Sequence, residues 1–273
     1  MRIPLSLILY FFSIATVYSQ SSFDALGAQN TALANTSATI GNSWSGFHNP
    51  ATLTSITSPT LGINFHNSYS LLNLNAGSLA ISAPMLKRQL FGFAGVHRFG
   101  DKLYNEHRLT MALGLKIANT SIGFSFNSLQ LAVLNYRTTY NFSLNIGALT
   151  KLSESLYIGT SISNITQAAT LEEGPAIIPS VINMGLRYMP MDYFTFRLEA
   201  EKDLNHRFFI RSSLEYQVIK RWTIQSGIRS DNWQWYYGSS FQLNELALNY
   251  AGSYHDTLGY SHGLSLVYSF EKK

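Results

Sequence analysis

An alternation of apolar and polar residues with a period of two dominates this chain and limits what it can fold into. Between Tyr260 and Phe270, one set of alternate positions is mainly apolar or aromatic: Tyr260, His262, Leu264, Leu266, Tyr268 and Phe270. The positions between them are mostly small: Ser261, Gly263, Ser265, Val267 and Ser269. A period of two predicts β-strands with one apolar face. Beyond residue 20 no apolar run approaches the length of a membrane-spanning helix, so this part of the chain can cross a membrane only with strands.

The same alternation recurs along most of the sequence and predicts fourteen strands. Each segment is roughly 9 to 12 residues long, which is about what a tilted strand needs to cross a bilayer. Only 12% of the residues are charged and 14% are aromatic, a balance that is unusual for a soluble protein. The segments begin near Leu61, Leu74, Gln89, His107, Ser121, Thr138, Ser155, Ser180, Tyr193, Arg207, Arg221, Asn232, Leu246 and Gly259.

The connections between these segments alternate between short and longer ones. If the N-terminus is periplasmic, every second connection should be a tight periplasmic turn. The longest connection, Thr166–Pro179, then falls on the outside of the cell, together with Gly100–Glu106 and His255–Leu258. An even strand count with this asymmetry predicts a closed transmembrane antiparallel β-barrel rather than a soluble sandwich, because closure leaves no exposed sheet edge. The tight turns are Pro84–Arg88, Asn119–Thr120, Leu152–Glu154, Met189–Asp192, Ile219–Lys220 and Asn244–Glu245.

The N-terminus has the features of a signal peptide. Met1-Arg2 precedes an apolar core, Ile3 to Thr16, and Val17-Tyr18-Ser19 places small or modest residues at the −3 and −1 positions of a cleavage site. We therefore expect residues 1–19 to be removed and the mature chain to be exported. The sequence has no cysteine, which excludes a lipoprotein and a disulfide framework. The formal net charge of +4 is too small and too scattered to indicate a nucleic-acid partner.

The stretch from Gly27 to Leu53 does not follow the strand pattern. It is rich in small and polar residues, has no lysine or arginine, and ends in Asn49-Pro50-Ala51. It has no apolar stripe broad enough to fold alone, so it must lie against or inside something larger. The proline at position 50 disfavours a helical conformation for Asn49 and indicates a turn there.

This stretch resembles the start of the mature chain in two groups of outer-membrane barrels, the FadL-like fatty-acid transporter family and the PorV/PorQ proteins of type IX secretion. The resemblance rests on Gly27-Ala28, on Ala32-Leu33-Ala34, and then on Trp44, Phe47, Asn49, Pro50 and Ala51. It implies that residues 20–58 form a hatch-like segment associated with a barrel of residues 59–273. The candidate hatch motif consists of Gly27, Trp44, Phe47, Asn49, Pro50 and Ala51.

One charged constellation lies on the polar faces of the eighth to eleventh predicted strands. Its members alternate with apolar residues such as Phe194, Phe196 and Leu198, so we expect them to point into the lumen. Two interpretations stay open: a mutually neutralising network that fills the barrel, or a polar pathway or docking surface for the N-terminal segment. Arg197, Arg211 and Arg229 are the expected partners of that segment under the second interpretation. The full set is Arg187, Arg197, Glu199, Glu201, Arg211, Glu215 and Arg229.

The remaining motifs give no support to an enzyme. Ser261 and His262 are neighbours on one strand and face opposite sides, so they cannot form a catalytic dyad. The seven histidines are scattered without a metal-ligand spacing, and we expect no metal site and no cofactor. Trp233, Trp235 and Tyr237 alternate with Gln234, Tyr236 and Gly238, which favours an interfacial aromatic girdle over a ligand-lining patch.

The sequence therefore predicts a non-enzymatic barrel in the bacterial outer membrane, with outer-membrane lipid as one partner. From the resemblance, the main functional prediction is a PorV/PorQ-like partner barrel in type IX-related secretion, which would contact a translocon or a cargo protein. The alternatives are a FadL-like channel for hydrophobic small molecules and a purely structural barrel.

Overall fold

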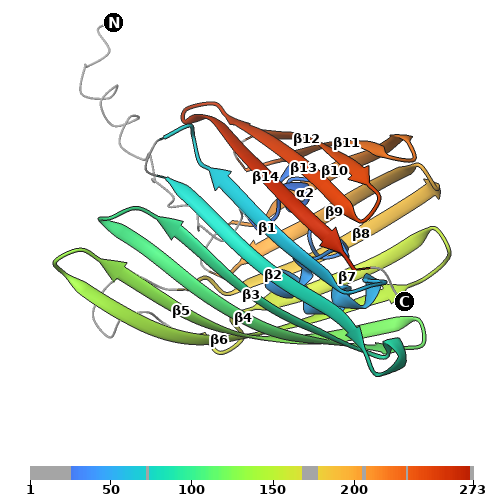
Figure 1. The fold of residues 1–273 in the computed structure, drawn as a ribbon, viewed down its shortest axis with the longest axis horizontal. Coiled ribbons are helices and arrows are strands. Elements are labelled where there is room, and N and C mark those ends of the chain that lie inside the picture. Colours follow the sequence, from blue (N-terminus) through green and yellow to red (C-terminus); the bar gives the residue numbers. More distant parts are fainter. Residues whose placement is uncertain (1–25, 72–73, 168–177, 205–206, 232, 271–273) are drawn as a thin grey trace, which may run out of the picture.

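The computed structural model describes residues 26–71, 74–167, 178–204, 207–231 and 233–270. Fourteen strands form a closed barrel (Figure 1). The strands are β1 Thr60–Asn67, β2 Asn75–Met85, β3 Leu90–Gly100, β4 Tyr104–Ile117, β5 Thr120–Val133, β6 Arg137–Lys151, β7 Leu156–Ser163, β8 Val181–Met191, β9 Phe194–Asp203, β10 Phe209–Ile219, β11 Trp222–Arg229, β12 Gln234–Leu243, β13 Leu246–His255 and β14 Gly259–Ser269. The predicted all-β fold and the predicted number of strands are confirmed.

Each strand pairs with its neighbours in sequence, and the first strand closes the ring against the last. The seam between β1 and β14 is antiparallel and regular, with Leu61 opposite Tyr268 and Phe65 opposite Leu264. Closure pairs the backbone groups that would be exposed along two sheet edges, which a strand in lipid must have satisfied.

The two faces of the strands differ as the alternation predicts. On β6, Phe142 and Leu144 are 58% and 42% exposed, whereas Ser143 and Asn145 are 8% and 2% exposed and point inward. Large apolar side chains cover the outer surface in the same way on every strand, for example Met111 and Leu266. A surface of this kind is suited to hydrocarbon and not to water, so the molecule is a transmembrane barrel of the outer-membrane type. No helix in the described residues is long and apolar enough to span a membrane.

The predicted strand starts agree with the observed ones to within about three residues, and the largest difference is at β4. The sequence predicted a connection over Gly100–Glu106, but β3 continues to Gly100 and β4 begins at Tyr104. The connection is short because the Asp101 carboxylate accepts hydrogen bonds from the backbone N–H groups of Leu103 (2.8 Å) and Tyr104 (3.1 Å) and closes a tight loop. These donors, that of Tyr104 first, lower the pKa of Asp101 below its ordinary value.

The described part of the N-terminal segment, residues 26–59, lies inside the barrel. It contains a short helix α2 (Ala28–Ala32) and two 3₁₀ helices, η3 (Ser45–Phe47) and η4 (Pro50–Ser55), but no strand. Figure 1 shows α2 and the blue turns that follow it within the ring of strands. Most of its side chains are buried, including polar ones such as Asn30, Thr36 and Asn49. The predicted signal peptide and most of the predicted Thr166–Pro179 loop lie outside the described residues.

Candidate functional site

The Asn-Pro-Ala turn fixes the N-terminal segment both to itself and to the barrel wall. Asn49 is extended and caps η4, where its side-chain Oδ1 accepts from the Ala51 N–H (3.1 Å) and Pro50 occupies the start of the helix. Its amide Nδ2 donates to the Ala38 carbonyl (2.7 Å) and to the Ala148 carbonyl on β6 (3.3 Å). Asn49 is 0% exposed, so these three bonds satisfy groups that water does not reach.

Three inward-facing glycines form the surface on which this turn rests. Gly114, Gly123 and Gly147 stand opposite one another on β4, β5 and β6. A Cβ atom at Gly147 would overlap Asn49 Oδ1 and lie 2.9 Å from its Cγ, and one at Gly114 would lie 2.9 Å from the Pro50 carbonyl oxygen. The missing side chains let the backbone of the turn approach the wall closely. These glycines were not predicted to form a contact surface, because nothing in the sequence of a single strand indicates what packs against it.

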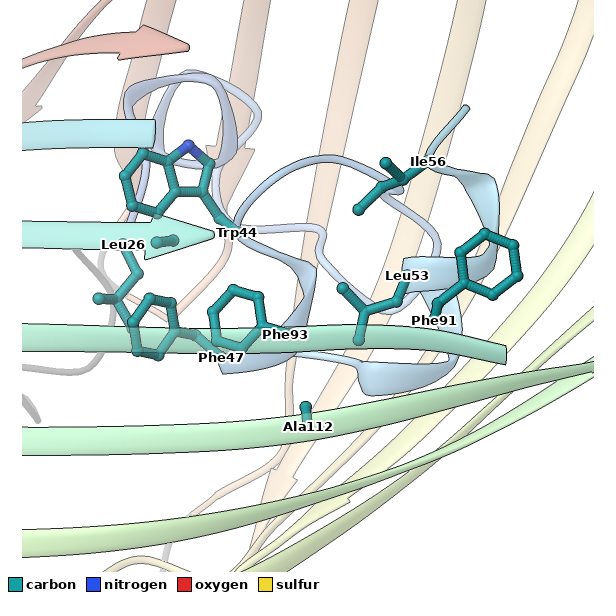
Figure 2. Packing of buried hydrophobic residues seen from close by; sticks show 9 residues of the cluster. Leu26, Trp44, Phe47, Leu53, Ile56, Phe91, Phe93 and Ala112 are labelled. Carbon is teal, nitrogen blue, oxygen red and sulfur yellow. The ribbon is translucent and has the colours of Figure 1, made fainter. Parts of the chain in front are cut away.

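One side of the N-terminal segment is held by an apolar cluster. Figure 2 shows Trp44, Phe47 and Leu53 of the segment among wall residues of β3 and β4. Phe47 meets Phe93 edge to face, with ring centroids 5.0 Å apart and planes at 80°. Each member of the cluster is at most 8% exposed: Leu26, Trp44, Phe47, Leu53, Ile56, Ala80, Phe91, Phe93 and Ala112. This half of the contact is stabilised mainly by apolar burial.

The opposite side of the segment contacts the predicted charged constellation on β8 to β10. The Glu199 carboxylate accepts from the Ala38 N–H at 2.7 Å. Arg211 Nη1 donates to the Asn35 carbonyl (3.0 Å) and Arg187 Nη1 to the Thr39 carbonyl (3.2 Å). These bonds anchor the backbone of the segment through charge-assisted donors and acceptors.

The same constellation also forms ion pairs within the wall. Arg211 pairs with Glu201 at 2.8 Å and Arg197 with Glu215 at 3.5 Å. Arg229, expected to bind the N-terminal segment, forms two 2.8 Å hydrogen bonds with Asp231. The structural network and the docking surface, which the sequence left as alternatives, therefore coexist in one set of side chains.

A cavity of about 100 Å³ lies between the N-terminal segment and the wall formed by β4 to β10. Its lining is mainly polar, with several asparagines and the charged side chains of Arg108, Glu201 and Arg211. Apolar side chains, among them Phe47, Leu129 and Val181, complete the lining. The sequence did not predict this cavity, because it is formed where the segment and seven strands meet.

Other predicted features are placed as follows. Ser261 points inward, whereas His262 lies on the outer surface, where its Nδ1 is 2.9 Å from the Tyr250 hydroxyl. Trp235 on β12 is 56% exposed on the outer surface, as an aromatic girdle requires, and Trp233, in the connection before β12, is 70% exposed. Among the described residues there is no group of three or more His, Asp or Glu side chains that could hold a metal ion.

Gly27, the first residue of the candidate hatch motif, packs against the motif tryptophan. It has a positive φ of 94°, and a Cβ there would meet the indole ring of Trp44, with Nε1 at 2.8 Å. A side chain at this position would therefore be strained and would displace the ring. Gly27, Trp44, Phe47, Asn49, Pro50 and Ala51 thus all take part in packing the segment inside the barrel.

Comparison with known proteins gives a likeness in structure only. No family model and no curated protein matches this chain. The crystal structure of the Pseudomonas putida toluene transporter TodX aligns with a TM-score of 0.70 at 9% identity, over 92% of this chain and 100% of that one. A TodX mutant titled a monoaromatic hydrocarbon channel gives 0.66 at 11% identity, over 89% and 99% of the two chains. A Pseudomonas aeruginosa FadL homologue gives 0.63 at 12% identity, over 90% and 98%. The chain thus shares the fold of these three barrels.

Proposed function

We propose that this protein is an outer-membrane channel for small hydrophobic compounds, similar in kind to the FadL-like channels. The observation that carries the proposal is a fourteen-stranded barrel whose lumen is occupied by its own N-terminal segment. The fold is shared with proteins described as a toluene transporter and a monoaromatic hydrocarbon channel. The shared fold supports the alternative prediction from the sequence, a FadL-like channel, better than the main one, a partner barrel in type IX-related secretion.

The arrangement inside the lumen is suited to selective passage. The N-terminal segment excludes a wide aqueous pore, and its aromatic side chains, Trp44 and Phe47, supply apolar surface within the barrel. The segment contains no strand of its own, and separate contacts attach it to the wall. A shift of part of the segment can therefore open a path without breaking the backbone pairing of the barrel.

A partner role in type IX-related secretion remains a prediction from the sequence resemblance. No observation in the described residues favours it over the channel. A pull-down from detergent-solubilised outer membrane tests it, because recovery of a translocon component would favour the partner role.

The channel is tested by uptake of radiolabelled toluene in a bacterial host that lacks its own channels for hydrophobic compounds. Two tryptophan substitutions on β6 make a matched pair. Ser143→Trp places a large side chain in the lumen cavity, whereas Phe142→Trp changes the adjacent, lipid-facing position. We expect the wild-type protein and Phe142→Trp to increase uptake and Ser143→Trp to reduce it severalfold. Uptake no higher than in cells without the protein, at equal outer-membrane levels, would refute the channel.

A further inference from the structure

The lumen cavity presents hydrogen-bond donors whose direction is fixed by the wall. Asn127 on β5 has its Oδ1 occupied by the Thr110 hydroxyl (2.7 Å) and by Arg108 Nε (3.3 Å). Arg108 Nε can only donate, so the atom it contacts must be the amide oxygen. The amide nitrogen of Asn127 has no hydrogen-bond partner among the described residues.

Asn145 on β6 repeats this arrangement. Its Oδ1 accepts from the backbone N–H of Asn164 at 2.9 Å, which again fixes the oxygen end of the amide. Its Nδ2 also has no partner among the residues that the structure describes. Asn127 and Asn145 are both 2% exposed and lie diagonally across neighbouring strands, because Asn127 stands opposite Ser143. A buried donor without an acceptor is costly, so two of them at one cavity indicate a ligand or water with acceptor atoms.

Two further asparagines of the lining can adapt to such a ligand. The side-chain oxygens of Asn35 and Asn183 have no hydrogen-bond partner in the described part of the chain. No hydrogen bond there fixes which end of either amide is the oxygen, so each amide can turn its nitrogen inward. Neither therefore opposes a ligand that brings only acceptors.

The charges of the lining favour an anion over a cation. Arg108 and Arg211 line the cavity together with one carboxylate, Glu201, which pairs with Arg211 at 2.8 Å. Two cations and one anion give the lining a net charge of +1. Glu106, two residues from Arg108 on the same face of β4, lies outside the lining; its carboxylate attracts Arg108 and offsets part of that charge, and it accepts a hydrogen bond from the Tyr104 hydroxyl.

The size and the remaining lining limit the rest of the ligand. The volume of about 100 Å³ is of the order of the engineered apolar cavity of about 150 Å³ that binds benzene, and is below the roughly 300–1,000 Å³ of drug-sized pockets. Phe47, Leu129 and Val181 provide apolar contacts beside the amides. The space thus fits one ring or a short branched chain, with polar atoms at one end.

From these observations we infer that the lumen cavity binds the carboxylate of a small organic acid, with the Asn127 and Asn145 amides as donors to its oxygens. The inference adds a ligand class for the lumen of the channel and rests on that proposed function for its biological role. The binding itself can be measured on the purified protein whether or not the channel transports toluene.

The experiment is isothermal titration calorimetry of the full-length protein, purified in detergent, with benzoate and separately with toluene. The two probes share a benzene ring; benzoate has a carboxylate where toluene has a methyl group. Asn127→Asp and Asn145→Asp keep the oxygen that the wall requires and replace the donor by a second, negatively charged acceptor. Asn141→Asp is the matched control, because Asn141 is a buried asparagine on the same face of β6 but does not line the cavity. Heat-modifiable migration verifies that each variant is folded.

We expect saturable benzoate binding at least tenfold tighter than toluene binding. Asn127→Asp and Asn145→Asp should each weaken it at least tenfold, and Asn141→Asp less than threefold. Absence of saturable benzoate binding to the folded wild-type protein would overturn the inference, as would equal affinity in the cavity variants. Water alone would then occupy the cavity. Toluene uptake without benzoate binding would support the proposed channel and contradict only this inference.

Discussion

Replacing Gly147 by alanine should push the Asn-Pro-Ala turn away from the wall, and replacing Asn49 as well should relieve the clash. The Cβ atom of Gly147→Ala would overlap Asn49 Oδ1, while Pro50 Cδ would remain 3.3 Å away. Asn49→Ala removes both the Oδ1 and the Cγ atoms that the new methyl group meets. The two substitutions therefore act on one contact and should not be additive.

The magnitudes follow from the contacts. Gly147→Ala should cost about 1–3 kcal/mol of stability, as overpacking of a tight site does. Asn49→Ala loses the cap of η4, at about 1 kcal/mol, and leaves the Ala38 and Ala148 carbonyls without their side-chain donor, at about 0.5–1.5 kcal/mol each. Its total is thus about 2–4 kcal/mol. The double variant should cost about as much as Asn49→Ala alone. The double variant should therefore be about 1–3 kcal/mol more stable than the sum of the two single effects predicts, and this difference is the coupling free energy.

Equilibrium unfolding by denaturant in lipid vesicles, followed by tryptophan fluorescence, measures the stability of the wild type, the two single variants and the double variant. The rate at which a protease cleaves the N-terminal segment gives a second readout if the segment detaches before the barrel unfolds. Gly77→Ala is the control, since a Cβ at Gly77 has no atom within 4 Å and should cost little. Additivity of the two single effects to within about 0.5 kcal/mol would show that Asn49 does not rest on Gly147.

Three further outcomes are expected. Leu144→Arg should destabilise the inserted barrel by about 2–4 kcal/mol if the site is at mid-membrane. Asn145→Arg, on the inner face, should be tolerated better. Equal effects in a vesicle-insertion assay would contradict the assigned faces. Deletion of residues 26–56 should leave a folded barrel with higher conductance in planar bilayers, and a barrel that fails to fold would contradict this. The hydroxyl oxygens of Thr36 and Ser213 are 2.8 Å apart, so the double variant Thr36→Cys with Ser213→Cys should form a disulfide. This disulfide should lower toluene uptake until a reductant is added. Unchanged uptake in the oxidised form would show that this contact stays closed during passage.

The strands could be predicted from the sequence because the membrane imposes a local rule. Every second residue of a lipid-facing strand must be apolar, and this is visible within one segment such as Tyr260 to Phe270. The start of β4 was misplaced by three residues, because Asp101 closes the preceding connection with side-chain bonds that alternation does not encode. Residue type and face were enough to place the charged constellation inside the barrel.

The contacts of the candidate site were beyond the sequence for a different reason. Asn49 binds the Ala148 carbonyl 99 residues away, and a backbone carbonyl has no signature in the side-chain sequence. The seat of Gly114, Gly123 and Gly147 requires the register between three strands, since each glycine alone is an ordinary small residue on a polar face. For the same reason, Arg211 could be named as a partner of the segment, but its acceptor, the Asn35 carbonyl, could not.

The position of the N-terminal segment ahead of β1 has a consequence for the order of assembly. The last seam to form in sequence order joins β1 to β14, and the segment that leads into β1 is enclosed by that seam. Its polar partners lie largely on strands in the middle of the chain, at Gly147, Arg187, Glu199 and Arg211, while α2 packs on β12 to β14. We therefore expect the curved sheet to receive the segment while still open and to close around it. Insertion of this barrel should then be slower than that of an empty barrel with the same strands, because a long-range contact must form before the ring can shut.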